Sequence, residues 1–302
     1  MMNDQLEITV KKAQEASDDL KTFFRSFVSM AERLNAEWRF QINGEPARRI
    51  QPFSFESLRH MFSYELETAQ DNFLQREKRA GKDWGTVDRY VKSSADPKEQ
   101  TTRRNYLRLL AWRALKGRFL EGLCLMSTLS RMSPIGHQPD IDPFGQIGPI
   151  HVRDEGGECF LGTRPLVESQ RSGLNAIPDI AITRTPDKVS TSNIVSVIEC
   201  KCRDNLGATD LRAEFGKAYD LGSPSYVLVS YYSVRESLLN AGKGLGIDVQ
   251  VFSLSTSDRN QFIRGERDLG EDMAIKLSNA RKRHLFLTTL EDRAANVRHR
   301  LD

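Results

Sequence analysis

Two short apolar runs separated by a polar turn place the strongest constraint on the fold of this chain. The first run, IPDIAITR, begins at Ile177, and the second, NIVSVIECK, ends at Lys201. Their composition, and the Thr-, Pro-, Asp- and Ser-rich segment between them, predict an antiparallel β-hairpin. Residues opposite each other in such a hairpin share a face, so a pairing of Asp179 with Glu199 places both carboxylates together. Lys201 shares their face because side chains alternate along a strand. We therefore expect two carboxylates and an ammonium at one place on an apolar sheet.

This hairpin resembles the PD-(D/E)XK nuclease superfamily, which has a restriction-endonuclease-like fold. Pro178-Asp179 stands for PD, and Glu199-Cys200-Lys201 stands for (D/E)XK. The resemblance covers roughly residues 103–254, with a helix expected before the hairpin and a helix and a strand after it. It implies an α/β (α+β) fold with a mixed central sheet flanked by helices in the order αβββαβ. The alternative is an edge strand with an exposed Glu–Lys pair and a Pro-Asp turn.

The resemblance also implies a reaction, the metal-dependent hydrolysis of phosphodiester bonds by an endonuclease. Mg²⁺ takes oxygen ligands, keeps several waters and binds one or two carboxylates together with phosphate; Mn²⁺ can substitute. Asp179 and Glu199 are the expected ligands, and the resemblance adds the backbone carbonyl of Cys200. Lys201 is expected to orient the attacking water and to stabilise negative charge on the phosphate. Asp179, Glu199 and Lys201 are thus the predicted catalytic residues.

Further residues are candidates for the same site. Glu121 lies on the predicted helix before the first core strand, where the family's glutamate can reach the metal. An ion pair between Glu121 and Arg118 on the surface is an equal alternative. In the family the helix after the hairpin lends a polar side chain to the site, which makes Lys217 a candidate for substrate binding. Basic residues outside the hairpin are candidates for the same role: Arg103, Arg104, Arg281, Lys282 and Arg283.

The predicted domain boundary is the polar segment 93–102, which contains Pro97. Residues 1–100 are predicted to form a helical region, with helices up to about Asn43, from Ser54, and around Trp84. Residues 103–302 are predicted to form the nuclease-like domain, with a helical tail over about 258–302. The Pro- and Gly-rich segment 133–149 is expected to be either a functional loop over the site or a flap.

Within the second domain, the hydrophobic pattern predicts the remaining core elements. A strong helix is expected to start between Lys98 and Arg104, with Leu109 and Trp112 in its buried stripe. A helix between Gly207 and the C-capping Gly222 is expected to bury four side chains. The four are Leu211, Phe215, Ala218 and Tyr219. Strands are predicted over 158–167, 225–232 and 247–254, with a short helix around 236–240.

The composition indicates which kinds of partner and which cellular compartment to expect. The net charge of +3 is weakly basic, so nucleic-acid binding would depend on local basic patches. The sequence has no apolar run of about 18 residues and no signal-peptide core, which predicts a protein without a membrane partner. Four cysteines without a C-x-x-C pair predict a reduced, cytoplasmic protein, in which Cys200 and Cys202 pack as small apolar side chains.

Three classes of function follow from these observations. The first is a nuclease acting on nucleic acid, with DNA preferred, in the setting of a restriction enzyme or an antiviral defence effector. Double-strand cleavage needs two active sites, so a homodimer or a partner protein is expected in that case. The second is a catalytically silent nuclease-like fold that binds nucleic acid or acts as a scaffold, and the third is a structural domain with an accidental motif. The intact Asp179, Glu199 and Lys201 favour the first.

Overall fold

In a computed structural model the chain divides into two compact units. The structure describes residues 2–38, 50, 94–136, 141, 148–169, 172–186, 193–203, 206–222, 225–243 and 249–282. Unit 1 consists of Met1–Arg25 and Pro52–Phe119, and unit 2 consists of Ser26–Gln51 and Leu120–Asp302. The helices predicted from Ser54 and around Trp84 lie outside the described residues.

The division between the units differs from the boundary predicted at 93–102, because two long helices run across it. Helix α1 is Met2–Glu37 and helix α4 is Pro97–Leu129. Pro97 occupies the first helical position, where its missing N–H costs nothing, and the Asp96 side chain accepts a hydrogen bond from Lys98 N–H at 2.9 Å. The second half of the predicted linker is therefore the start of α4. Helix α1 ends at Glu37, before the predicted Asn43, and residues 39–49 lie outside the described part.

Unit 2 is built on a seven-stranded mixed sheet with the order β1-β2-β3-β6-β7-β8-β9. Neighbouring strands from β1 to β7 are antiparallel, whereas β7, β8 and β9 are parallel. The strands are β1 Ser133–Pro134, β2 Ile150–Asp154, β3 Gly157–Thr163, β6 Ile180–Thr183, β7 Ile194–Lys201, β8 Tyr226–Ser230 and β9 Val249–Ser253. Two further strands, β4 Val167–Glu168 and β5 Asn175–Ala176, form a separate antiparallel pair. The predicted class, α/β with a mixed sheet flanked by helices, is confirmed at this level.

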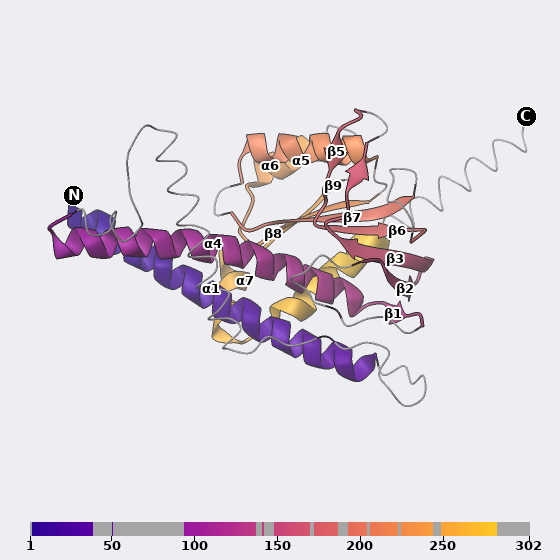
Figure 1. Cartoon of the computed structure of the whole chain (residues 1–302), viewed down its shortest axis with the longest axis horizontal. Helices are drawn as coiled ribbons and strands as arrows, with labels where there is room; N and C mark the ends of the chain where they lie inside the picture. Colours follow the sequence, from indigo (N-terminus) through magenta and orange to yellow (C-terminus); the bar gives the residue numbers. More distant parts are fainter. Residues whose placement is uncertain are drawn as a thin grey trace, which may run out of the picture. The chain divides into compact units, whose positions relative to one another are not determined.

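Helices cover both faces of the sheet in unit 2 (Figure 1). Helix α5, Ala208–Leu221, and helix α6, Glu236–Lys243, lie on one face. Ala218 and Leu221 of α5 pack with Val197 of β7 and Tyr226 of β8 in one apolar cluster. On the other face Cys124 of α4 hydrogen-bonds Cys200, and this bond and burial raise the pKa of the Cys200 thiol. Glu199 and Cys200 therefore point to opposite faces of the sheet, as alternation requires.

Helix α5 begins after Gly207 and ends at Gly222, as predicted. Gly222 has a φ of 57°, and its N–H donates to the carbonyl of Tyr219 at 3.1 Å, which closes the helix in the left-handed conformation that glycine adopts readily. The predicted buried face is correct for Leu211, Phe215 and Ala218, but Tyr219 is 57% exposed. The prediction for Tyr219 was wrong because adjacent residues in a helix point about 100° apart, so Tyr219 turns away from the stripe that holds Ala218.

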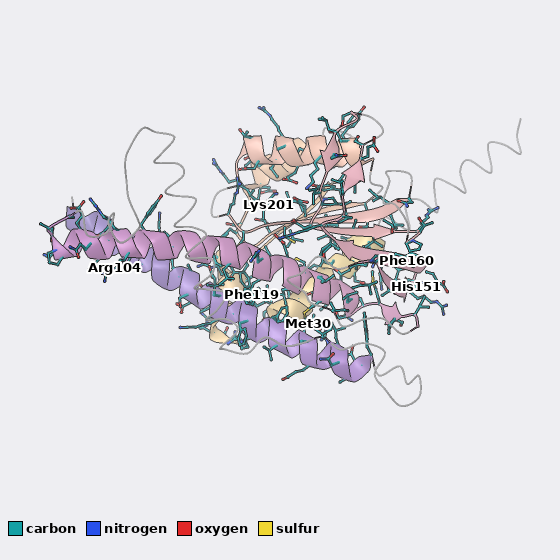
Figure 2. The ribbon with its side chains drawn as sticks, in the orientation of Figure 1. Met30, Arg104, Phe119, His151, Phe160 and Lys201 are labelled. Atoms are coloured by element: carbon teal, nitrogen blue, oxygen red, sulfur yellow. The ribbon has the colours of Figure 1, made fainter. Side chains whose placement is uncertain are left out.

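The strand predicted over 158–167 is in fact the second half of a hairpin that the sequence did not reveal. Strands β2 and β3 pair with Asp154 opposite Gly157, whose φ of 106° suits only glycine at this turn. His151 and Phe160 lie opposite each other and stack at 4.5 Å between ring centroids (Figure 2). β3 ends at Thr163, and Val167 belongs to β4. In the segment 133–149, β1 occupies Ser133–Pro134, and 137–140 and 142–147 lie outside the described residues.

The described residues after Ser255 are largely helical, as expected, and residues 283–302 of the predicted tail lie outside the described part. Helix α7 is Thr256–Arg264, and residues 269–282 form another helix. A side chain at Gly270 would come within 2.6 Å of Met30 Cγ, and the Gly270 carbonyl accepts a hydrogen bond from Ser127 at 3.0 Å. Arg33 and Arg131 both pair with Glu271. The second halves of α1 and α4 therefore share a core with this helix, which explains why a division near residue 100 does not separate the units.

Candidate active site

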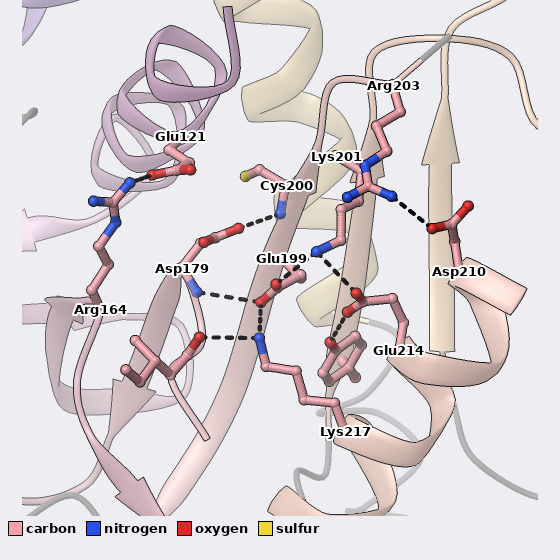
Figure 3. Close-up of polar contacts among 12 residues, drawn as sticks. Glu121, Arg164, Asp179, Glu199, Cys200, Lys201, Arg203, Asp210, Glu214 and Lys217 are labelled. Carbon is pink, nitrogen blue, oxygen red and sulfur yellow. Dashed lines mark hydrogen bonds and ion pairs between the residues drawn. The ribbon is translucent and has the colours of Figure 1, made fainter. Parts of the chain in front are cut away.

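The two acids of the predicted motif meet at one end of the β6–β7 pair. Ile180 pairs with Ile198, so the same register places Asp179 opposite Glu199, as predicted. The N–H of Cys200 donates to Asp179 Oδ2 at 2.7 Å, and the N–H of Asp179 donates to Glu199 Oε2 at 3.3 Å (Figure 3). Each carboxylate is thus fixed by the backbone of the opposite strand.

The surroundings of Asp179 disfavour its charged form. Burial, followed by the negative charges of Glu199 and Glu121, raises its pKa from 3.8 to about 7, although the Cys200 N–H and Lys217 act in the opposite direction. In Figure 3 its carboxylate lies between Glu121 on α4 and Glu199 on β7. A bound cation would relieve this repulsion and favour the ionised form.

Glu199 is 4% exposed and is held between two lysines. Its Oε1 lies 3.1 Å from Lys201 Nζ, and its Oε2 lies 2.7 Å from Lys217 Nζ. Lys217 also donates to the carbonyl of Ile177 at 3.0 Å. Helix α5 therefore brings Lys217, a predicted substrate-binding residue, to the motif itself.

Lys201 reaches one of the two motif acids and a second acid that was not predicted. Besides Glu199, its Nζ lies 2.9 Å from Glu214 Oε1 on α5. The carboxylate of Asp179 accepts a hydrogen bond from the Cys200 N–H. Burial lowers the pKa of Lys201, but Glu199 and Glu214 outweigh burial and raise it above its ordinary value. The lysine is accordingly charged at neutral pH.

Glu214 and Tyr226 complete the site, and the sequence reading missed both. The Tyr226 hydroxyl donates to Glu214 Oε2 at 2.7 Å, and both side chains are buried. Burial, with the nearby charges of Glu199 and Glu214, raises the pKa of Tyr226, so the phenol remains a donor. Glu214 lies three residues before Lys217 on α5, a spacing that places both on one side of a helix and could have revealed it. The apolar residues around it, Leu211, Phe215 and Ala218, concealed that signal.

Glu121, the other predicted ligand, pairs with Arg164 rather than with Arg118 (Figure 3). Arg164 directly follows β3, and its N–H donates to the carbonyl of Asp179 at 3.0 Å. This contact places Arg164 next to the motif. No feature of the sequence near Arg164 had indicated it.

The other basic residues predicted to bind substrate have different surroundings. Arg281 is buried against Asp154, and Lys282 lies 2.8 Å from Glu155, so both tie the last helix to the β2–β3 turn. An occupied guanidinium with 11% of its side chain exposed does not favour a substrate contact at Arg281. In unit 1, Arg103 pairs with Glu99 at 2.6 Å, and Arg104 is exposed on the same helix. Arg283 lies outside the described residues.

The donor set suits a hard cation that keeps part of its water. Among the described residues, no group of three or more His, Cys, Asp or Glu side chains is arranged to hold a metal ion on its own. Asp179 and Glu199 supply two carboxylates, and Mg²⁺ is commonly bound by one or two carboxylates together with water and phosphate. The fit is therefore to Mg²⁺ or Mn²⁺ rather than to a metal enclosed entirely by side chains.

Comparison with known proteins assigns no family. No protein-family model matches the chain, and no curated protein matches it significantly. The crystal structure of protein VC1899 from Vibrio cholerae aligns with a TM-score of 0.30 and 13% sequence identity, covering 94% of this chain and 57% of that one. The chain thus spans just over half the length of that protein, and the likeness is too low to carry an argument about fold or activity. Within the described residues, no helix is long and apolar enough to cross a membrane.

Proposed function

We propose that this protein is a metal-dependent nuclease of the PD-(D/E)XK type that hydrolyses phosphodiester bonds, with DNA as its substrate. The observation that carries the proposal is the placement of Asp179 opposite Glu199, with Lys201 two residues further along β7 and bound to Glu199. With β1 and β2 set aside as an addition at the sheet edge and β4–β5 as a separate pair, the remaining series α4, β3, β6, β7, α5, β8 supports it, because it has the αβββαβ order that the resemblance implies. A reducing, cytoplasmic setting belongs to the same proposal.

In this proposal Asp179, Glu199 and the Cys200 carbonyl hold Mg²⁺, which activates water and neutralises phosphate charge when bound. Lys201 donates hydrogen bonds to the phosphate as negative charge develops, because its ammonium is held charged by Glu199 and Glu214. Lys217 occupies one oxygen of Glu199 and must release it before that oxygen can bind a cation. Asp179 must also lose its proton, so metal affinity should rise as the pH passes about 7.

The test is the nicking of supercoiled plasmid by the full chain in Mg²⁺, Mn²⁺ and EDTA. We expect nicking in Mg²⁺ or Mn²⁺ and none in EDTA. Glu199→Gln keeps the size of the side chain and should reduce the rate by at least ~100-fold, because a ligand and its charge are lost.

The matched control is Glu158→Gln, an exposed acid on β3 that pairs with Arg153 at 2.6 Å. It should cut like the wild type. Nicking that persists in EDTA, or that survives Glu199→Gln at the control rate, would refute the proposed function. Parallel reactions on single-stranded DNA and RNA, with mapping of the product ends, would define the substrate.

A further inference from the structure

Arg164 has a backbone conformation that its sequence alone does not favour. Its φ is 50°, in the left-handed region where glycine is preferred, and it is the one non-glycine residue of the described chain with a positive φ. Its N–H extends the β3–β6 pairing by one hydrogen bond to the carbonyl of Asp179. Glycine would satisfy this backbone position without strain. The presence of a long cationic side chain at a strained position is characteristic of functional sites.

The ion pair that Arg164 forms leaves most of its hydrogen-bonding capacity unused. Its Nη2 binds Glu121 Oε2, while the guanidinium carries five N–H donors on three nitrogens. Side-chain exposure is 41% for Arg164 and 25% for Glu121. Exposed ion pairs contribute little to stability, so this pair alone does not explain the residue. It does hold the guanidinium in one place beside Glu121.

Exposure distinguishes Arg164 from the two lysines that contact Glu199. Lys201 and Lys217 are 25% and 21% exposed, and each has two acceptors, which are Glu199 and Glu214 for Lys201 and Glu199 and the Ile177 carbonyl for Lys217. Both lysines are committed to the acids of the site. Arg164 is the most accessible of the three, and it lies on the opposite side of Asp179 from Lys217 (Figure 3).

We propose that Arg164 binds a backbone phosphate of the nucleic acid, adjacent to the phosphate that is cleaved. The inference rests on the proposed function, since it names the substrate contact of that same site. A planar guanidinium matches a phosphate with two parallel hydrogen bonds, and Glu121 acts as the positioning residue that orients it. The contact recognises the backbone and not the bases, so it is independent of nucleotide sequence.

The test measures binding separately from cleavage. A short fluorescein-labelled DNA duplex is titrated with the full chain in EDTA and again in Ca²⁺, over a range of KCl concentrations, by fluorescence anisotropy. Arg164→Gly removes the guanidinium and suits the positive φ, so the fold should be retained with an unchanged or higher Tm. Binding should weaken by roughly 10-fold, equally on two unrelated sequences, and the slope of log K against log salt should become shallower by about 1. Arg164→Lys should keep the slope and lose part of the affinity, because it keeps the charge without the fork.

The matched control is Arg153→Ala, which removes another exposed, ion-paired arginine, 60% exposed on β2. Its affinity and salt slope should equal those of the wild type. Affinity and slope in Arg164→Gly within twofold of the Arg153→Ala values would overturn the inference, as would a wild-type chain that does not bind DNA. Plasmid nicking by the same preparations separates the two proposals. If the chain cleaves plasmid but its binding does not depend on Arg164, only the proposed phosphate contact is refuted. If binding depends on Arg164 but no metal-dependent cleavage occurs, only the proposed nuclease activity is refuted.

Discussion

Two groups of charged side chains, one in each unit, differ in how their charges balance. In unit 1, Lys116 Nζ lies 3.2 Å from Asp19 Oδ2, and the two side chains are 3% and 0% exposed. At the site of unit 2, four carboxylates meet three cations, and Asp179 binds a backbone N–H rather than a cation. The carboxylates are Asp179, Glu199, Glu214 and Glu121, and the cations are Lys201, Lys217 and Arg164.

The difference teaches which buried charges serve packing and which serve chemistry. A matched pair leaves little net charge behind and fixes one helix against another, whereas unpaired excess charge costs stability. Such an excess persists where a site is arranged for a ligand, and perturbed pKa values gather there for that reason. The raised pKa of Asp179 is the reason we propose that a cation binds at the site of unit 2.

The largest expected effect is the loss of the matched pair. Lys116→Met leaves Asp19 buried without its ammonium and should lower the free energy of unfolding of unit 1 by roughly 3–5 kcal/mol. Urea denaturation followed by circular dichroism measures the change. The double variant Lys116→Met with Asp19→Leu should recover most of this loss, because both buried charges are removed together. A single-variant loss below about 1 kcal/mol would show that the pair is not a matched structural unit.

Lys201 should have its main effect on activity. Its loss should cost less stability than that of Lys116, because Lys217 still pairs with Glu199 and the Tyr226 hydroxyl still donates to Glu214. Lys201→Met keeps the apolar stem and removes the ammonium, so cleavage should fall by at least ~100-fold while DNA binding is nearly unchanged. Lys201→Arg should also be poor, since a planar fork does not replace a compact charge. Initial nicking rates and anisotropy titrations provide the two measurements. Cleavage at the wild-type rate in Lys201→Met, together with loss in Glu199→Gln, would make the lysine a bystander.

The sequence predicted the centre of the fold better than its edges. The β6–β7 hairpin and the apolar β8 followed from local composition, because a buried strand must be apolar and a hairpin must turn. The β2–β3 hairpin was missed because His151, Arg153 and Glu158 interrupt its apolar pattern. The division into units could not be predicted, since it depends on Gly270 packing against Met30, some 240 residues away in the chain.

The candidate site shows the same limit. Asp179, Glu199 and Lys201 were recoverable because they are close in sequence and their spacing fixes their face. Arg164 was not, because its role depends on a backbone angle and on Glu121, 43 residues earlier. The ion pair of Arg281 with Asp154 could not be predicted either, because a basic cluster in the sequence does not show which acids lie near it in the fold.

The pH dependence of stability tests the comparison between the two charged groups, because Asp179 belongs to the group in unit 2. Its folded pKa of about 7 exceeds the usual 3.8, so between these values the folded state keeps a proton that the unfolded state releases, and stability falls as pH rises. At 1.36 kcal/mol per pKa unit the shift sets a ceiling of ~4 kcal/mol, and partial exposure and sharing with Glu199 reduce this to on the order of 1–2 kcal/mol. Asp179→Asn should flatten the decline between about pH 4 and pH 7 and be the more stable protein at pH 8.

A bound metal ion should restore the stability that is lost when Asp179 ionises beside Glu199. Mn²⁺ added at pH 8 should raise the Tm of the wild type and leave that of Asp179→Asn nearly unchanged, because only the folded wild type binds the ion. Scanning calorimetry across the pH range measures both effects. Parallel curves for the two proteins from pH 4 to pH 8 would mean that Asp179 is not the acid under strain.

The smallest expected effect concerns the hydrogen bond that holds Glu214. Tyr226→Phe removes the hydroxyl that lies 2.7 Å from Glu214 Oε2 and leaves that oxygen buried without this donor, which should cost about 1–2 kcal/mol of stability. Lys201 keeps both of its carboxylate partners, so cleavage should fall only a few-fold, through kcat rather than KM. Glu214→Gln removes one of the two charges that hold the ammonium and should lower kcat further than Tyr226→Phe does. If Tyr226→Phe instead reduced cleavage as much as Lys201→Met, the hydroxyl would take part in the reaction directly. Tyr226 would then belong with the charged residues that serve the chemistry rather than with those that serve packing.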